Sequence, residues 1–332
     1  MLNPTQAMRP RWMAATPATV VWQRRGVRLL HYTPRADGPS RRSPLLIVSS
    51  MINRYYVLDL LPGHSLVEHL VAQGHQVYLL DWGQPEPEDR FLDLDGCIVD
   101  LLGAGIDRAR RHAGARRVGL LGYSVGGTLA AIHAALRPET TAFLINLCGP
   151  IDFARGGLFA AWTDRRWFSA DAIVDAFGNL PAAFLQSSFS WLVPTMLARK
   201  LGTLALRAGD EGYLRLFAAV ELWAADNVAF RGGAYRGYIR ELYQENRLVK
   251  GELEVRGQPV RLEAIRCPVL VVVASGDEIA PPASALALRD RCGSEDVQAT
   301  QVQGGHVGVM IGSQAQRSLW PTLDRWLHAR PI

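Results

Sequence analysis

Short runs of apolar residues recur along the first half of the chain and again near its end. Each run is rich in Val, Leu and Ile and is bounded by glycine, proline or polar residues, which is typical of strands buried on both faces of a sheet. We predict strands at residues 44–50, 76–80, 117–123, 142–147 and 268–274, and a further strand at 296–302.

Between these runs, apolar residues recur every three or four positions, which predicts helices. The helical patterns cover residues 65–73, 94–112, 126–136, 282–292 and 308–328. Strands that alternate with helices favour an α/β fold with a mostly parallel, doubly wound sheet. Ahead of it, residues 19–23 and 27–32 flank Arg24-Arg25-Gly26 and predict a β-hairpin.

The alternation stops between residues 151 and 262, where the pattern is helical and contains no clear strand. This stretch holds eight of the ten Phe and four of the nine Trp residues, which need a core or a ligand. We interpret it as an inserted helical cap, in which most aromatic side chains pack and a few line an apolar acyl pocket. The predicted divisions are a basic segment with the hairpin (1–43), the first part of the core (44–150), the cap (151–262) and the second part of the core (263–332).

The composition is that of a globular protein with a sizeable core. Of 332 residues, 48% are hydrophobic and 20% are charged, and the net charge is +5. No stripe of interleaved basic and aromatic residues appears, which argues against nucleic-acid binding, whereas the positive charge suits an anionic ligand such as acyl-CoA. The locally basic N-terminal region contains Arg9, Arg11, Arg24, Arg25, Arg28, Arg35, Arg41 and Arg42.

The cysteines and the N-terminal region bear on the compartment. Cys97, Cys148, Cys267 and Cys292 form no C-x-x-C pair and lie in or beside apolar segments, so we expect buried free thiols in a reducing compartment. Residues 1–25 are broken by prolines and arginines, and no apolar run reaches the length of a membrane span. The sequence therefore predicts a cytoplasmic protein without a membrane span.

The segment Gly122-Tyr-Ser124-Val-Gly126 fits the pattern G-x-S-x-G between a predicted strand and a predicted helix. In this context a serine nucleophile is held on a sharp bend, where small flanking residues let strand and helix approach each other. A glycine-rich phosphate loop would instead need the spacing G-x-G-x-x-G or G-x-x-x-x-G-K, which is missing. We predict that Ser124 is a nucleophile.

A serine nucleophile needs a base, and the base needs an acid that orients it. Among the eight histidines, His306 stands in the glycine-rich loop Gly304-Gly-His306-Val-Gly308, between the last strand and the last helix. Asp277 follows closely after the strand at 268–274. The order Ser124, Asp277, His306 along the chain is that of the α/β-hydrolase fold, so we predict that the three form a catalytic triad.

An oxyanion hole needs two N–H donors near the nucleophile. One should be the backbone N–H of Val125, directly after Ser124. The other should come from the loop after the strand at 44–50, where Ile52 and Met51 are the candidates.

Several longer segments extend this picture: Asn53-Arg-Tyr-Tyr-Val-Leu-Asp59-Leu, Tyr78-Leu-Leu-Asp81-Trp82-Gly83, Gly149-Pro-Ile-Asp152-Phe and Tyr243-Gln-Glu-Asn246-Arg-Leu-Val-Lys-Gly251-Glu-Leu. With them, the chain from about residue 19 to its end resembles the polyhydroxyalkanoate synthases, above all the short catalytic subunits that lack a long N-terminal domain. The resemblance implies transfer of 3-hydroxyacyl groups from coenzyme A into a polyester, with acyl-CoA as substrate and no bound cofactor. It also implies a granule surface and a second, non-homologous subunit as partners, and we expect a homo-oligomer.

Two residues depart from the family pattern. The family nucleophile is cysteine, where this chain has Ser124, and the family acid is often followed by histidine, where this chain has Glu278. A cysteine forms a thioester that keeps the acyl group activated, whereas the ester on a serine is less activated, so that water competes with the growing chain.

Three functions therefore stay open. The first is a synthase-like acyltransferase that uses Ser124, and the second is a serine hydrolase, such as an esterase, thioesterase or intracellular polyester depolymerase. The third is a granule-associated or scaffold protein that has lost catalysis, and the altered nucleophile and the aromatic cap motivate it.

Overall fold

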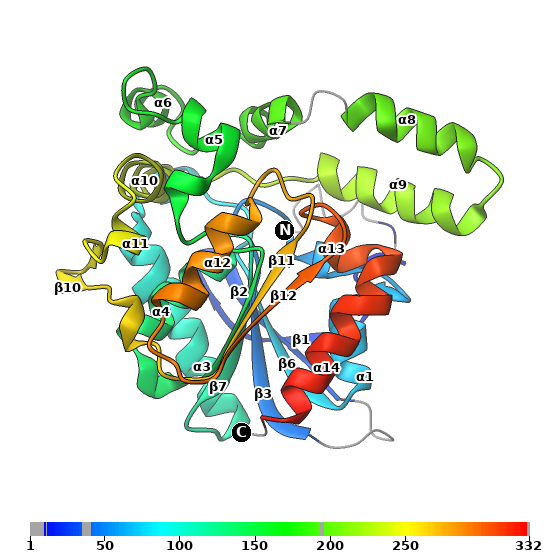
Figure 1. Ribbon diagram of the computed structural model, residues 1–332, viewed down its shortest axis with the longest axis horizontal. Helices are drawn as coiled ribbons and strands as arrows, with labels where there is room; N and C mark the ends of the chain where they lie inside the picture. Colours follow the sequence, from blue (N-terminus) through cyan, green and yellow to red (C-terminus); the bar gives the residue numbers. More distant parts are fainter. Residues whose placement is uncertain (1–9, 11, 35–40, 193–195, 331–332) are drawn as a thin grey trace.

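The computed structural model describes residues 10, 12–34, 41–192 and 196–330. Eight strands form one sheet in the order β1-β2-β6-β3-β7-β8-β11-β12 (Figure 1). The strands β1 and β2 form the predicted antiparallel hairpin, β2 pairs antiparallel with β6, and every pair from β6 to β12 is parallel. Their bounds are β1 Ala18–Arg24, β2 Val27–Tyr32, β3 Arg41–Val48, β6 His75–Asp81, β7 Val118–Tyr123, β8 Thr141–Leu147, β11 Val269–Ala274 and β12 Val297–Val302. The predicted mostly parallel sheet is confirmed.

The sheet has an apolar cluster on each face because successive side chains of a strand point to opposite sides. In β3, Leu46 and Val48 belong to one cluster, whereas Leu45 and Ile47 belong to the other. The first cluster is covered by α3 (Ala104–Ala113), α4 (Val125–Leu136) and α12 (Pro282–Arg291), and the second by α1 (Leu66–Ala72), α13 (Gly308–Ile311) and α14 (Trp320–His328) (Figure 1). This two-sided cover explains why the central strands consist of continuous apolar runs.

Two predicted helices are interrupted. The pattern at 94–112 is divided into α2 (Leu94–Gly96), a π-helical segment at Cys97–Gly103 and α3. The pattern at 308–328 ends first at Gly312, whose extended backbone closes α13, and continues as a π-helical segment at Ala315–Leu319 and then α14. A π turn differs from an α turn by one additional residue within a single turn, and this change is too local for a pattern read over the whole helix to reveal it.

The cap is a layer of helices at one end of the sheet (Figure 1). It contains α5 (Gly157–Trp162), α6 (Ala170–Phe177), α7 (Ala182–Leu192), α8 (Met196–Leu206), α9 (Glu211–Ala225), α10 (Gly232–Gly237), a π-helical segment at Tyr238–Gln244, and α11 (Arg247–Lys250). The expectation that 151–262 contains no strand is wrong in one detail, because β9 (Glu254–Val255) pairs with β10 (Gln258–Pro259). Strands of two residues are too short to give an alternating pattern. The domain boundaries themselves stay a prediction.

Short pieces also occur in the loops between the main elements. They are 3-10 turns at Tyr55–Leu58, Pro87–Phe91, Pro138–Thr140, Phe153–Arg155 and Leu262–Ala264, and the paired strands β4 (Asp59–Leu61) and β5 (His64–Ser65).

The basic and cysteine residues are placed as follows. Arg9, Arg11 and Arg35 lie outside the described residues. All four cysteines are free, and Cys97 and Cys148 are buried as expected, but Cys267, in the loop before β11, and Cys292, directly after α12, are only half-buried. No helix in the described part of the chain is both long and apolar enough to cross a membrane.

Candidate active site

Ser124 lies between β7 and α4, at the sharp bend that the sequence predicts. Its backbone has φ +56 and ψ −128, a conformation that is rare for a residue with a β-carbon. At the neighbouring positions only glycine avoids a steric clash. A β-carbon on Gly122 would lie 2.5 Å from the Gly126 carbonyl oxygen, and one on Gly126 would lie 2.1 Å from the Val48 carbonyl oxygen. Strand and helix can therefore close around Ser124 only with glycine at both positions.

The structure brings Ser124, His306 and Asp277 together in one hydrogen-bonded chain. His306 Nε2 lies 2.9 Å from Ser124 Oγ, and His306 Nδ1 lies 2.6 Å from Asp277 Oδ2. All three side chains are buried, with exposed fractions of 7% for Ser124, 9% for His306 and 4% for Asp277. A carboxylate only accepts hydrogen bonds, so Nδ1 carries the proton and Nε2 is left to accept the proton of Ser124.

The acid and the base are each fixed by further contacts. Asp277 Oδ1 accepts hydrogen bonds from the backbone N–H groups of Ile279 (3.0 Å) and Ala280 (2.8 Å). The Tyr123 hydroxyl donates to the His306 carbonyl oxygen at 3.3 Å, and the two rings lie 5.2 Å apart. These contacts fix the orientation of the carboxylate and of the imidazole before a substrate binds.

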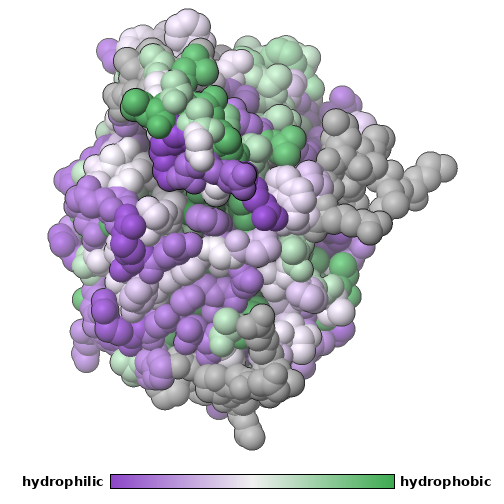
Figure 2. Space-filling model, turned by 90° about the vertical axis from the view of Figure 1, so that its right-hand side faces the viewer, coloured by the Kyte–Doolittle hydropathy of each residue, from purple (hydrophilic) through white to green (hydrophobic). Residues whose placement is uncertain are grey.

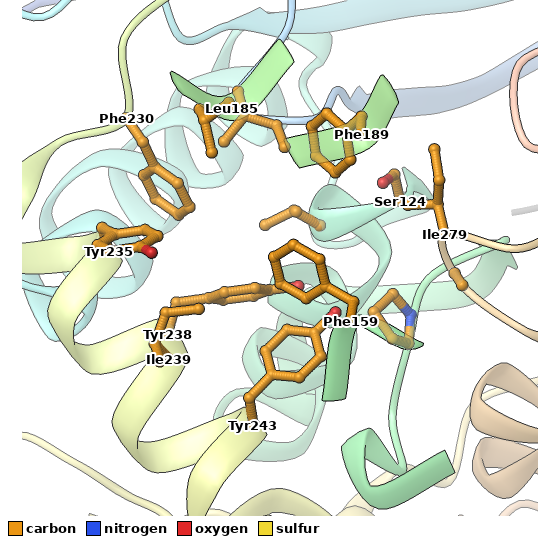
Figure 3. Close-up of a pocket in the computed structure, with 14 residues that line it drawn as sticks. Ser124, Phe159, Leu185, Phe189, Phe230, Tyr235, Tyr238, Ile239, Tyr243 and Ile279 are labelled. Atoms are coloured by element: carbon orange, nitrogen blue, oxygen red, sulfur yellow. The ribbon is translucent and has the colours of Figure 1, made fainter. Parts of the chain in front are cut away.

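An apolar pocket opens over Ser124, between the sheet and the cap. It encloses about 490 Å³, its open mouth included. Figure 3 shows the aromatic side chains of the cap arranged around this space, with Ser124 at its edge. The wall is formed by Ile52, Ser124, Val125, Pro150, Phe159, Leu185, Phe189, Phe230, Tyr235, Tyr238, Ile239, Tyr243, Ile279 and Ala280.

The phenol groups of this wall stay neutral. Burial raises the pKa of Tyr235 and of Tyr243 far above the usual phenol value, and the nearby Asp277 carboxylate adds to the effect on Tyr243. The pocket therefore presents apolar carbon and a few neutral hydroxyls, which suits the acyl part of an ester or thioester.

The predicted oxyanion residues are placed unequally. Val125 is the first residue of α4, where helical N–H groups have no acceptor within the helix, and it lines the pocket beside Ser124. Ile52 also lines the pocket, whereas the side chain of Met51 is 1% exposed and packs in the core below. Of the two candidates for the second donor, Ile52 is therefore the one next to the space that a substrate would occupy.

One further side chain stands at this site, and the sequence analysis did not assign it a role. Cys148 follows β8 directly, and its sulfur, an Asp277 carboxylate oxygen and a His306 ring nitrogen all lie within 4.8 Å of one another. It is the only cluster of three metal-ligating groups among the described residues. However, Asp277 and His306 are only 2.6 Å apart, too close for a zinc ion with ligand bonds of about 2 Å between them. The sequence feature that could have indicated Cys148 is its position directly after a central strand, because Ser124 and Asp277 also follow central strands.

Two family models match the chain. The model for the alpha/beta hydrolase fold matches residues 44–312, and the model described as the N-terminus of poly-beta-hydroxybutyrate polymerase (PhaC) matches residues 9–70.

Curated relatives point the same way. The chain is 34% identical to the poly(3-hydroxyalkanoate) polymerase subunit PhaC of Haloferax mediterranei, over 95% of this chain and 64% of the relative. It is 31% identical to the protein of the same name from Allochromatium vinosum, over 95% of this chain and 89% of the relative. For the Synechocystis protein of that name the identity is 33%, over 95% of this chain and 85% of the relative. The chain thus spans a little under two thirds of the Haloferax relative.

Solved structures support the fold alone. A thermophilic esterase from Thermogutta terrifontis matches with a TM-score of 0.59 and 18% identity, over 95% of this chain and all of that one (100%). A monoacylglycerol lipase from Paleococcus ferrophilus matches with a TM-score of 0.57 and 16% identity, over 91% of this chain and 99% of that one. The fold predicted from the sequence is confirmed.

Proposed function

Because the chain belongs to the poly(3-hydroxyalkanoate) polymerase (PhaC) family within the α/β-hydrolase fold, we propose that it transfers 3-hydroxyacyl groups from CoA thioesters. The observation that carries this proposal is the hydrogen-bonded chain from Ser124 through His306 to Asp277, at the edge of an apolar pocket. These three residues are the catalytic residues of the proposal.

The first half-reaction forms an acyl-enzyme. Ser124 Oγ attacks the thioester carbonyl carbon while its proton passes to His306 Nε2, and negative charge develops on the carbonyl oxygen. The backbone N–H groups of Val125 and Ile52 are the proposed donors to this oxygen. The carbon–sulfur bond then breaks, CoA leaves as a thiol with the proton from His306, and the acyl group remains as an ester on Ser124.

The second half-reaction moves the acyl group to an acceptor. The hydroxyl at the end of a growing 3-hydroxyacyl chain gives its proton to His306 Nε2 and attacks the ester carbon. Ser124 Oγ leaves and takes the proton back, and the chain is longer by one unit. The apolar wall of Phe159, Phe189 and Phe230 supports this step, because it keeps bulk water away from the ester.

Hydrolysis is the second candidate, and the observation that favours it is the oxygen nucleophile itself. The ester on Ser124 is chemically similar to the esters of the product, so chain extension gains little free energy from it. Water that attacks the same carbon would release a free hydroxy acid, and the enzyme would act as an esterase, thioesterase or polyester depolymerase.

The product formed from 3-hydroxybutyryl-CoA decides between them. Thiol release and polymer should both appear with the native chain, both should disappear in Ser124→Ala, and Ser124→Cys should raise the ratio of polymer to free acid. Release of CoA with free acid as sole product would replace the transferase by the hydrolase. No thiol release and no labelling of Ser124 by a fluorophosphonate would contradict both.

The apolar surface of the cap supports the partners that we propose. Figure 2 shows apolar side chains gathered at the top of the molecule, above a largely hydrophilic lower part. We propose that this surface meets a polyester granule in the cytoplasm, a second subunit or a second copy of the chain, and that acyl-CoA is the substrate. Trp191→Ser should weaken cosedimentation with polyester granules, and unchanged cosedimentation would remove the surface from the proposal. Among the cap residues whose burial the structure describes, the exposed large apolar side chains are Leu158, Trp167, Phe177, Trp191, Leu201, Leu206 and Leu222.

A further inference from the structure

Cys148 occupies a strained position at the carboxyl edge of the sheet. Its backbone N–H donates to the Val272 carbonyl oxygen at 2.9 Å, which continues the pairing of β8 with β11 by one residue. Its φ is +51, in the left-handed region that a residue with a β-carbon rarely adopts. Strain of this kind persists where the surrounding structure enforces it, and it is concentrated at functional sites. Ser124, with φ +56, holds the corresponding place at the end of β7.

The side chain of Cys148 faces the acid of the site. Its sulfur is within 4.8 Å of both an Asp277 carboxylate oxygen and a His306 ring nitrogen, and the residue is 1% exposed. Burial, and after it the Asp277 carboxylate, raises the pKa of the Cys148 thiol well above its usual value. The sulfur therefore keeps its proton, and a neutral thiol next to a carboxylate donates a hydrogen bond to it.

The other hydrogen-bond donors around Asp277 do not replace the Cys148 thiol. Oδ1 already receives the backbone N–H groups of Ile279 and Ala280, and Oδ2 receives His306 Nδ1. Tyr123 and Tyr243 also lie in the field of this carboxylate and stay neutral, because burial raises the pKa of both. His306 Nδ1 is thus the donor to Oδ2, and the Cys148 thiol is the remaining donor beside the carboxylate.

We propose that Cys148 is a positioning residue, whose thiol donates to Asp277 and fixes the carboxylate in the orientation that aligns His306 with Ser124. Cys148 does not line the pocket, so we place its thiol beside the acid and away from the space that the acyl group would occupy. The inference rests on the proposed role of Ser124, His306 and Asp277 in acyl transfer or hydrolysis. It holds for either reaction, because both need the same base.

Serine and alanine at position 148 form a matched pair for the test. Both carry one β-carbon at the same φ and both are smaller than cysteine, but only serine keeps a donor. We expect Cys148→Ala to lower kcat about tenfold with little change in KM, and Cys148→Ser to retain kcat within about threefold, because a hydrogen bond to a charged group is lost only in the former. If Cys148→Ala does not fold, Cys148→Gly removes the same donor without backbone strain and takes its place.

A second measurement separates positioning from packing. The proton between His306 Nδ1 and Asp277 gives a low-field NMR resonance, which should move in Cys148→Ala and return toward its native position in Cys148→Ser. Equal losses of activity and thermal stability in both variants, with an unmoved resonance, would assign Cys148 to packing and overturn the inference. Wild-type kcat in Cys148→Ala would overturn it as well. Absence of turnover in the native chain would instead contradict the proposed function.

Discussion

The exchange Asp277→Asn tests how the acid acts on His306. In the native structure Asp277 Oδ1 accepts from two backbone N–H groups at 2.8 and 3.0 Å, and Oδ2 lies 2.6 Å from His306 Nδ1. An amide has one oxygen and one NH2 group, so the two backbone donors select the oxygen for the Oδ1 position. The NH2 group then faces Nδ1, which must give up its proton to accept.

The change therefore inverts the tautomer of His306. The proton moves to Nε2, which points at Ser124 Oγ and can no longer accept the serine proton. Turning the amide over would leave two buried N–H groups without acceptors, at about 1–3 kcal/mol each, so the inverted tautomer persists. Enzymes with this triad lose about 10⁴-fold in kcat after the same change, and we expect a loss of that order here, equivalent to about 5 kcal/mol in activation free energy.

Initial rates with 3-hydroxybutyryl-CoA and with a p-nitrophenyl ester measure the loss, and thermal unfolding shows whether the variant folds. Glu278→Gln is the matched control, because it makes the same change of charge and chemical group at the exposed neighbouring position. It should stay near wild-type activity. A folded Asp277→Asn variant with kcat within tenfold of the native value would refute the role of Asp277 as the group that sets the tautomer.

Three further predictions concern the sharp bend at Ser124, the core and the pocket. Gly126→Ala should destabilise the fold by about 3 kcal/mol or more in urea unfolding, because its β-carbon would lie 2.1 Å from the Val48 carbonyl oxygen. Gly202→Ala is the control and should not destabilise the fold, because a β-carbon on Gly202 has no neighbouring atom within 4 Å. Burial lowers the pKa of His133 from 6.5 to about 4, so the unfolded chain binds a proton that the folded chain does not. The free energy of unfolding should therefore fall by up to about 3 kcal/mol as the pH drops from about 6.5 towards 4, and this contribution should be missing in His133→Leu. Phe189→Ala should enlarge the pocket and raise kcat/KM for 3-hydroxyhexanoyl-CoA relative to 3-hydroxybutyryl-CoA several-fold, and an unchanged ratio would show that this wall does not limit acyl length.

The sheet and the three central residues of the site could be predicted from the sequence because both depend on local signals. Strands buried on two faces give continuous apolar runs, and Ser124, Asp277 and His306 each follow a strand within a few residues. The remaining features depend on distant contacts that leave no local pattern. The pocket wall formed by α7 and Tyr238–Gln244 and the approach of Cys148 to Asp277 both belong to this kind.

The segments that carry the family resemblance are explained by such distant contacts. In the segment that begins at Asn53, Arg54 pairs with Asp226 of the cap at 3.1 Å, and the Tyr56 hydroxyl donates to the same carboxylate at 2.7 Å. This segment directly follows Ile52, the proposed oxyanion donor, so the ion pair ties that loop to the end of α9.

A second pair of segments makes a similar contact between the core and the cap. Asn246 donates to the Asp152 carboxylate at 2.8 Å and accepts from the Phe153 backbone N–H at 2.9 Å. The bond links the end of the cap to the chain just after β8, next to Cys148. A serine nucleophile, a base and an acid can be recognised in a sequence from their chemistry. The hydrogen bonds and ion pairs that hold a cap over them cannot, because an isolated Asn or Asp occurs in many structural roles. These contacts explain why the segments that carry the resemblance include residues outside the reacting groups, since Arg54, Asp152 and Asn246 connect the core to the cap above Ser124.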